Sequence, residues 1–323
     1  MGEPGDKVAV CEVGPRDGLQ MAHARMPTEA KIAWIAAIAA AGVREIEVGS
    51  FVPPRLIPQM ADTAEVVAAA RARLPGVTVI ALAPNLRGAQ RAAEAGAHRV
   101  AVPVSVSEGH SRANLNRTPD EQVAEVGRIV AWAREAGVPM QVEAACSTAF
   151  GCSIDGAVPE AETVRVAHGL AAAGAGAVAL CDTVGYADPA QVRRVVRAVR
   201  REIGGTLKTL HLHDTMGLGL ANALAGLEEG IRSFDGALAG LGGCPFAPGA
   251  SGNIVTEDLV FMLESMGFET GIDLERLVAA REALRAHLPD EPVHGALARA
   301  GLPRTFRKAR RSVQESAQEP ALT

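Results

Sequence analysis

The sequence predicts an α/β protein built as a (β/α)8 barrel with extra C-terminal helices, and three observations lead to this prediction. First, short apolar runs rich in β-branched residues alternate with Ala-rich amphipathic segments along most of the 323 residues. Second, eight such runs occur, and many of the helical segments close with Ala-Gly, where glycine supplies the left-handed conformation that ends a helix. Third, no linker rich in Pro, Gly or Ser interrupts the first 300 residues. A barrel of this kind spans roughly 250 residues before insertions, so one large domain is expected.

The expected strands of the barrel are the eight short apolar runs. They lie at residues 7–14, 44–50, 77–83, 99–105, 139–145, 177–182, 206–213 and 233–239. An open doubly wound sheet is the alternative, but it usually has about five or six strands and a different Gly-rich phosphate-binding turn. The larger number of strands therefore favours a TIM barrel.

Amphipathic segments between the strands predict the outer helices. They lie at residues 28–41, 62–73, 120–136, 160–173, 189–201 and 218–230, and two more follow the last strand at 257–266 and 274–284. We expect residues 1–302 to form one catalytic barrel domain that includes these C-terminal helices. Residues 303–323 are basic and then polar without an apolar period, so a flexible tail is expected there.

Composition argues against several classes of function. A formal net charge of -5 gives no general electrostatic attraction to nucleic acid or to an anionic membrane. The five cysteines form no C-x-x-C pair, which suits a reduced compartment rather than a disulfide framework. No charged and then apolar leader precedes the first apolar run, and no apolar run reaches the length of about 20 residues that crossing a bilayer takes. We therefore expect a cytoplasmic protein that binds neither nucleic acid nor a membrane.

Polar and charged side chains end several of the apolar strands, and this is where a barrel places its active site. They are Arg16, Asp17, Glu47, Glu143, Asp182, His211 and His213. Charged groups that point into a barrel are costly unless they are paired or bind a metal ion. The carboxyl ends of these strands are therefore the candidate site.

The segment His211-Leu-His213 is the sharpest local signal for a metal site. Residues i and i+2 of a strand face the same side, so both imidazoles can bind one ion, whereas two hydrogen-bonded core histidines are the alternative. Asp17 follows another strand and supplies a carboxylate, and Asn253 could add an amide oxygen. Two nitrogens with hard oxygen ligands suit Mg²⁺ or Mn²⁺, since a closed zinc site would need more sulfur or imidazole.

Four further candidates have a structural as well as a functional interpretation. Cys244 lies in the segment GLGGCP at 240–245, so it is either a thiol on a mobile lid or a buried residue of a tight turn. Arg16 could hold an oxygen that gains enolate charge, or form an ion pair with a neighbouring carboxylate. Asp182 could serve merely as a helix cap instead of acting in catalysis, and Glu143 could be part of a salt bridge inside the barrel. We expect the other four cysteines to be packing residues.

Longer motifs extend these candidates along most of the chain. They are EVGPRDGLQ at 12–20, SFV at 50–52, PQMAD at 58–62, DTVG at 182–185, HLHD at 211–214, AGLGGCPF at 239–246 and GASGNIVTEDL at 249–259. In this order they resemble the 3-hydroxy-3-methylglutaryl-CoA lyases, and the likeness covers roughly residues 8–277. The combination of RDGLQ with GLGGCP is specific for that family, whereas His-x-His alone is not.

The resemblance implies roles for the candidate residues. The ligands of a divalent cation, Mg²⁺ or Mn²⁺, would be Asp17, His211, His213 and Asn253. The catalytic positions would be Arg16, Glu47, Asp182, Cys244 and His211. Ser107 and Asn114 would lie on the side of CoA and the acyl group. The partner implied is an acyl-CoA thioester substrate, and the family also implies a homodimer.

The reaction that the resemblance implies is cleavage of the C2–C3 bond of 3-hydroxy-3-methylglutaryl-CoA into acetyl-CoA and acetoacetate. Either Asp182 or His211 would take the hydroxyl proton. Arg16 would stabilise the thioester enolate, and Cys244 would help to move the proton that quenches it.

Two other activities and a non-catalytic role are the alternatives to this reaction. Val48-Gly49, His110 and Ala145 depart from the usual lyase pattern, so a citramalyl-CoA lyase or a lyase for a longer branched substrate is the main alternative. Condensing synthases share the barrel, the Arg-Asp pair and His-x-His, but the GLGGCP segment and the short chain after the barrel argue against them. A non-catalytic scaffold would have little need for ligands and a thiol at one mouth.

Overall fold

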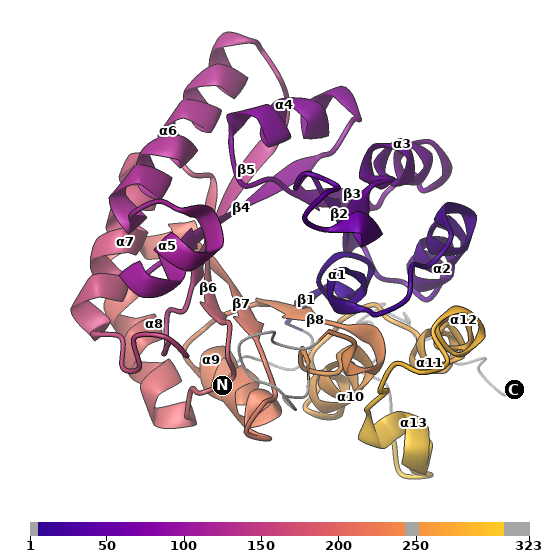
Figure 1. Ribbon diagram of the computed structural model, residues 1–323. Helices are drawn as coiled ribbons and strands as arrows, with labels where there is room; N and C mark the ends of the chain where they lie inside the picture. The colour runs from indigo at the N-terminus through magenta and orange to yellow at the C-terminus, as the bar shows by residue number, and fades with distance from the viewer. Residues whose placement is uncertain (1–5, 243–251, 307–323) are drawn as a thin grey trace, which may run out of the picture.

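The barrel is closed, which confirms the predicted fold. The computed structural model describes residues 6–242 and 252–306. Eight parallel strands pair in the order of the chain, and β8 pairs with β1 to complete the ring (Figure 1). The strands are β1 Ala9–Glu12, β2 Glu45–Ser50, β3 Thr78–Leu82, β4 Arg99–Ser105, β5 Gln141–Ser147, β6 Ala177–Asp182, β7 Leu207–Leu212 and β8 Ser233–Gly236.

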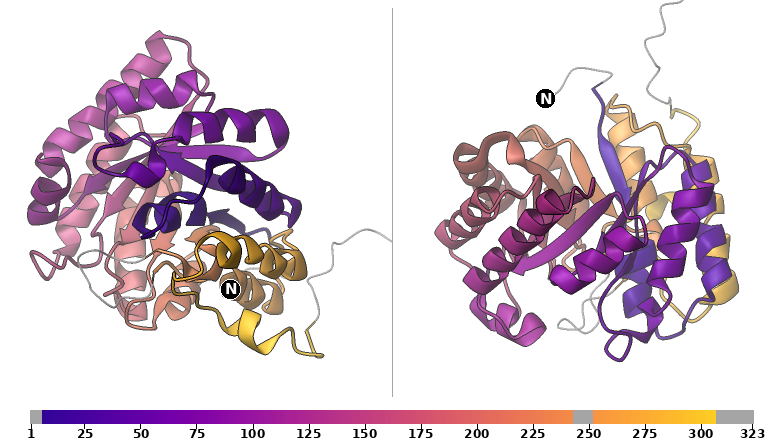
Figure 2. Two further views of the ribbon diagram at one scale, coloured as in Figure 1. Left: turned by 45° about the vertical axis from the view of Figure 1, so that its right-hand side comes forward. Right: turned by 90° about the horizontal axis from the view of Figure 1, so that it is seen from above.

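Helices form an outer ring around the strands, and the views in Figure 2 show this ring from two other directions. Those between the strands are α1 Leu19–Met21, α2 Thr28–Ala40, α3 Thr63–Arg73, α4 Leu86–Glu94, α5 Glu108–Leu115, α6 Pro119–Glu135, α7 Glu160–Ala172, α8 Pro189–Ile203 and α9 Gly219–Glu228. After β8 come α10 Thr256–Ser265, α11 Leu274–Ala279, α12 Glu282–His287 and α13 Ala296–Ala300. Helices α11 and α12 pack beside α2, so the C-terminal part of the chain returns to its beginning (Figure 1).

The structure differs from the sequence prediction in a few elements. The helix expected at 274–284 is two short helices, α11 and α12, joined near the buried Arg281. Helix α4 is not among the predicted helices, and Asn85 caps it by accepting a hydrogen bond from the Gly88 N–H. The first strand ends at Glu12 because residues Gly14–Gly18 form a single π-helical turn. That turn presents the first candidate site residues.

The two faces of each strand have different surroundings. In β4, Val100, Val102 and Val104 are buried on the outer face, where they join Val126 and Ile129 in the main hydrophobic core. Such a continuous apolar layer between a parallel sheet and its helices is the main source of stability of this fold.

Among residues 6–242 and 252–306, no helix combines the length and the apolar composition that crossing a membrane requires.

A buried ion pair links α10 to the junction between α11 and α12, and it gives a prediction about stability. Glu257 at the start of α10 is 0% exposed, Arg281 is 6% exposed, and the Arg281 guanidinium donates to Glu257 Oε1 and, at 2.7 Å, to the carbonyl of His294. Replacing Arg281 by methionine leaves the Glu257 carboxylate buried without its counter-charge. Loss of one partner of such a pair costs about 3–5 kcal/mol, so urea unfolding of Arg281→Met should show a loss of this size.

The matched control is Arg285→Met in the next turn, where the exposed Arg285 lies 3.6 Å from the exposed Glu282. An exposed pair contributes about 0–1 kcal/mol, so this variant should unfold almost like the wild type. Equal unfolding free energies for the two variants would contradict the role given to Arg281.

Candidate active site and metal centre

A cavity of about 760 Å³ opens at the carboxyl ends of the strands and is lined by residues of all eight of them. Its wall is formed by inward-facing positions, several of which carry small side chains, such as Ala101, Ala145 and Ala179. Arg55, in the loop after β2, and Asn114, in helix α5 after β4, continue the wall toward the mouth. The cavity therefore lies where the fold class places an active site.

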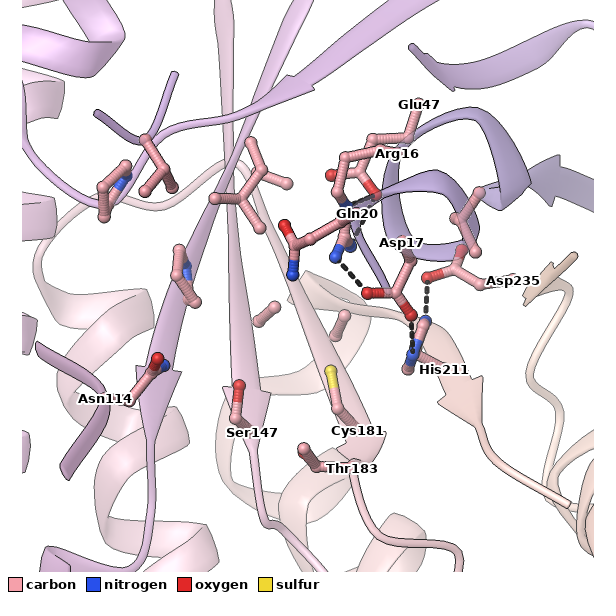
Figure 3. A pocket seen from close by; sticks show the side chains of 18 of the residues that line it. Arg16, Asp17, Gln20, Glu47, Asn114, Ser147, Cys181, Thr183, His211 and Asp235 are labelled. Atoms are coloured by element: carbon pink, nitrogen blue, oxygen red, sulfur yellow. Dashed lines mark hydrogen bonds and ion pairs between the residues drawn. The ribbon is translucent and has the colours of Figure 1, made fainter. Parts of the chain in front are cut away.

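Asp17, His211 and His213 come together in this cavity. His211 Nε2 lies 3.7 Å and His213 Nε2 lies 3.6 Å from the same atom, Asp17 Oδ2. Ligand atoms of the three residues lie within 4.8 Å of one another, which is compatible with a shared metal ion. His211 lies in β7 and His213 directly follows this strand, and both line the cavity, as the i, i+2 spacing predicts. Asp17 reaches toward His211 from the π-helical turn after β1 (Figure 3).

Asn253 completes the group. An isolated β-bridge pairs it with His213, and its Nδ2 donates to Asp17 Oδ2 at 2.9 Å. Its Oδ1 is buried and has no hydrogen-bond partner among the described residues. Turning the amide over would place that oxygen beside Asp17, where a cation would need it. Two imidazole nitrogens, a carboxylate and an amide oxygen fit Mg²⁺ or Mn²⁺ and leave positions for substrate.

Arg16 links the cluster to Glu47 on β2. Its Nε donates to Glu47 Oε2 at 2.6 Å, and its Nη1 donates to Asp17 Oδ1 (Figure 3). Burial alone would lower the pKa of Arg16, but the charges of Asp17 and Glu47 outweigh it and raise that pKa. Burial alone would raise the pKa of Asp17, but the Arg16 charge and the two histidines hold it well below its usual range. Asp17 is therefore an anion, as a metal ligand must be.

Asp182 does not line the cavity. Cys181 and Thr183 line the cavity, whereas Asp182 between them does not, because neighbouring residues of a strand face opposite sides. Its carboxylate is 0% exposed and accepts hydrogen bonds from the backbone N–H groups of Tyr186 at 3.0 Å and Ala187 at 3.1 Å. Burial raises the pKa of Asp182 to about 6, although these backbone hydrogen bonds oppose the rise. The carboxylate of Asp182 thus contacts the backbone of the loop before α8.

Ser107 lies apart from the cavity wall. This residue is the N-cap of α5, where its hydroxyl accepts from the His110 N–H at 3.2 Å and donates to Asp155 Oδ2 at 2.8 Å, and it does not line the cavity. Asn114, from the last turn of the same helix, does line the cavity (Figure 3). Glu143 pairs with Arg99 at 3.3 Å, which is the salt bridge inside the barrel that its position predicts.

The cysteines fall into two groups. Cys11, Cys146, Cys152 and Cys181 are buried free thiols, and of these Cys11 and Cys181 line the cavity. Burial raises the pKa of Cys146 to about 12, and it raises those of Cys11 and Cys181 as well, so these thiols are neutral and poor nucleophiles. Cys244 lies outside the described residues.

Sequence reasoning missed one carboxylate of the site, Asp235 on β8. Its Oδ2 lies 3.0 Å from His211 Nδ1, on the ring atom that does not face Asp17 (Figure 3). A charged residue in the middle of a predicted strand was the available signal, since the segment Ser233–Gly236 reads S-F-D-G. Burial alone would lower the pKa of His211, but the hydrogen bond and charge of Asp235 outweigh it and raise that pKa.

Fold and site together define a class. A closed (β/α)8 barrel with an Asp/His/His cluster and a cationic side chain at the carboxyl ends of its strands has the architecture of a metal-dependent barrel enzyme. The chain belongs to the HMGL-like family, whose pattern matches residues 7–284. Membership in this family and the relatives described next make the protein a carbon–carbon lyase.

Named relatives agree with that assignment. A hydroxymethylglutaryl-CoA lyase of Bacillus subtilis is 42% identical over 274 residues, which cover 85% of this chain and 91% of that protein. An (R)-citramalyl-CoA lyase of Chloroflexus aurantiacus is 41% identical over 305 residues, covering 92% of this chain and 95% of that protein. The structure of an HMG-CoA lyase from A. baumannii, in complex with coenzyme A and 3-methylmalate, superimposes with a TM-score of 0.87 at 41% identity, covering 95% and 99% of the two chains.

Proposed function

We propose that the protein is a lyase that depends on a divalent cation and cleaves 3-hydroxy-3-methylglutaryl-CoA into acetyl-CoA and acetoacetate. The observation that carries the proposal is the convergence of Asp17, His211 and His213 on one point, with Arg16 beside them, in a cavity lined by all eight strands. Identity of about 40% to proteins named hydroxymethylglutaryl-CoA lyase supports the choice of substrate.

Asp17, His211, His213 and the amide oxygen of Asn253 would hold Mg²⁺ or Mn²⁺. Such a cation supplies Lewis-acid chemistry, since it binds and polarises hydroxyl and carboxylate oxygens. Charged groups that are held away from bulk water interact more strongly with a bound substrate than they would in water. The remaining steps belong to side chains of the chain itself.

Arg16 would bind the thioester oxygen and hold the negative charge that develops on it when the C2–C3 bond breaks. Its contact with Glu47 at 2.6 Å fixes the guanidinium before substrate arrives, and such preorganised donors lower barriers without reorganisation during the reaction. The hydroxyl proton must pass to a base, for which His211 and Asp182 stay the two predictions. The proton then returns to C2 of the enolate, a step in which we propose Cys244 to take part.

A panel of thioesters tests the substrate. 3-Hydroxy-3-methylglutaryl-CoA yields acetyl-CoA with acetoacetate, whereas citramalyl-CoA yields acetyl-CoA with pyruvate, so the second product separates the two activities. We expect kcat/KM to be higher for the first compound. A higher kcat/KM for citramalyl-CoA would transfer the proposal to the activity after which the C. aurantiacus relative is named, and His110 and Ala145, which line the cavity, would be the residues to exchange.

Cys244→Ala is expected to lower kcat by about 10²-fold, because proton transfer by a placed group typically contributes that much or more. Mn²⁺ affinity should stay at the wild-type value, since the thiol is not one of the proposed ligands. The two quantities are measured separately, by steady-state kinetics and by electron paramagnetic resonance of free Mn²⁺. An unchanged kcat would remove Cys244 from the reaction.

Three other expectations stay predictions from the sequence. They are the homodimer, the cytoplasmic location and the division into a catalytic domain at 1–302 and a tail at 303–323. A condensing synthase would instead join acetyl-CoA to a keto acid, and an assay that supplies these two compounds detects it as consumption of acetyl-CoA.

A further inference from the structure

The contact between Asp235 and His211 is built into the register of the sheet. Strands β7 and β8 pair so that His211 and Asp235 lie directly opposite each other, and both side chains point into the barrel. The result is the 3.0 Å contact between His211 Nδ1 and Asp235 Oδ2 (Figure 3). Because it follows from strand pairing, this contact needs no loop to hold it.

The two ring nitrogens of His211 face two different carboxylates. Nδ1 lies against Asp235, and Nε2 lies 3.7 Å from Asp17 Oδ2, on the side of the proposed metal ligands. A ring that donates its Nδ1 hydrogen to a carboxylate leaves the Nε2 lone pair for a cation. Asp235 is not part of the group whose ligand atoms lie within 4.8 Å of one another. It therefore contacts the His211 ring and is not a proposed ligand of the ion.

His213 provides a contrast within the same site. Its Nδ1 is buried but has no hydrogen-bond partner among the described residues, and its backbone is held by the bridge to Asn253. Asp235 therefore holds Nδ1 of His211, whereas no described residue holds Nδ1 of His213, whose ring contacts Asp17 through Nε2. This difference predicts that the orientation of His211, and not that of His213, depends on Asp235.

We propose that Asp235 is a positioning residue that keeps the Nδ1 hydrogen of His211 in place and aims Nε2 at the metal site. The proposal rests on the metal site of the proposed function but concerns this chain's own ring and carboxylate. A purely structural Asp235 would stabilise the fold without influencing the position of the ring proton or the affinity for a cation. The two roles therefore predict different measurements.

The test compares Asp235→Ala and Asp235→Asn with the wild type. The control is Ser233→Ala, on the same inward face of β8, where the hydroxyl contacts Thr209 Oγ1 at 3.2 Å. Changes to a group that holds a metal-binding histidine typically weaken metal affinity by about 10–100-fold. We expect the Mn²⁺ dissociation constant to rise by this factor in Asp235→Ala, less in Asp235→Asn, whose amide oxygen can still accept, and not at all in Ser233→Ala.

The second measurement needs no metal. Long-range ¹H–¹⁵N correlation spectra of histidine-labelled protein, with His211 assigned by its own substitution, report which ring nitrogen carries hydrogen. Nδ1 of His211 should be protonated in the wild type in both the neutral and the charged ring, and Asp235→Ala should populate the tautomer with a bare Nδ1. Unfolding curves of all variants establish that the protein used is folded.

The outcomes separate the two ideas. Two results would overturn the positioning role whatever the metal result. One is an Nδ1 of His211 without hydrogen in the wild type, and the other is the same His211 tautomer in Asp235→Ala as in the wild type. A wild-type protein that binds no Mn²⁺ while the ring responds as expected would support the role of Asp235 and refute the metal-dependent function. Equal Mn²⁺ affinity of wild type and Asp235→Ala, when the wild type does bind, would also refute the inference.

Discussion

Asp17→Asn is expected to remove measurable Mn²⁺ binding and to lower kcat by about 10³-fold or more, which corresponds to ~4 kcal/mol of transition-state stabilisation. Asp17 supplies the carboxylate on which both histidine Nε2 atoms converge, at 3.7 and 3.6 Å. Asparagine has nearly the same shape but no charge, so the packing survives while the electrostatic attraction for a cation is lost. Isothermal titration with Mn²⁺ and steady-state kinetics on the same preparation give both quantities.

The matched control is Asp188→Asn, which makes the same chemical change at the N-cap of α8, outside the cavity. Asparagine also accepts hydrogen bonds at an N-cap, so metal affinity and kcat should both be unchanged. If Asp17→Asn bound Mn²⁺ as tightly as this control, the carboxylate would not be a ligand and the metal site would have to be rebuilt around other atoms.

Arg16→Gln is expected to lower kcat by about 10²–10³-fold, because removing one preorganised donor to a developing oxyanion typically costs that much. Glutamine can still donate a hydrogen bond but carries no charge to balance an enolate. Mn²⁺ binding should persist, since Arg16 contacts Asp17 without being a ligand. This split between lost turnover and retained metal distinguishes Arg16→Gln from Asp17→Asn.

Arg16→Lys adds a second comparison at the same position. Lysine keeps the charge but lacks the planar fork that contacts Glu47 and Asp17 together, so its kcat should lie between those of the glutamine variant and the wild type. A lysine variant as slow as the glutamine variant would show that the geometry of the fork matters more than the charge. Wild-type kcat in both would exclude Arg16 from the reaction.

The barrel could be predicted because its signal is local and repeated. The segments 99–105 and 177–182 were expected as strands and are the strands β4 and β6, since short apolar runs that follow Ala-Gly helix ends carry the information in a few neighbouring residues. Helix α4 was missed because it has only nine residues, although Asn85 is a local N-cap signal for it. At the break between α11 and α12, Arg281 contacts Glu257, which is distant in sequence.

The site was predictable where one strand or a family motif brings residues together. His211 and His213 share a face by spacing alone, and Asp17 and Asn253 join them across the barrel as the motifs imply. The direction of Asp182 could not be derived, since β6 reads A-V-A-L-C-D and is apolar on both faces, which leaves no alternation to show which residues point inward. Asp235 escaped notice because its partner is set by strand register, a property of the closed sheet.

Release of acetyl-CoA from 3-hydroxy-3-methylglutaryl-CoA, measured before and after removal of divalent cations, tests the central claim most directly. We expect the purified protein to form acetyl-CoA and acetoacetate in equal amounts, to stop after chelation, and to regain activity when Mg²⁺ or Mn²⁺ is added back. Cleavage that continues at an undiminished rate in the chelated protein, or no cleavage of any thioester in the panel with metal present, would contradict the account.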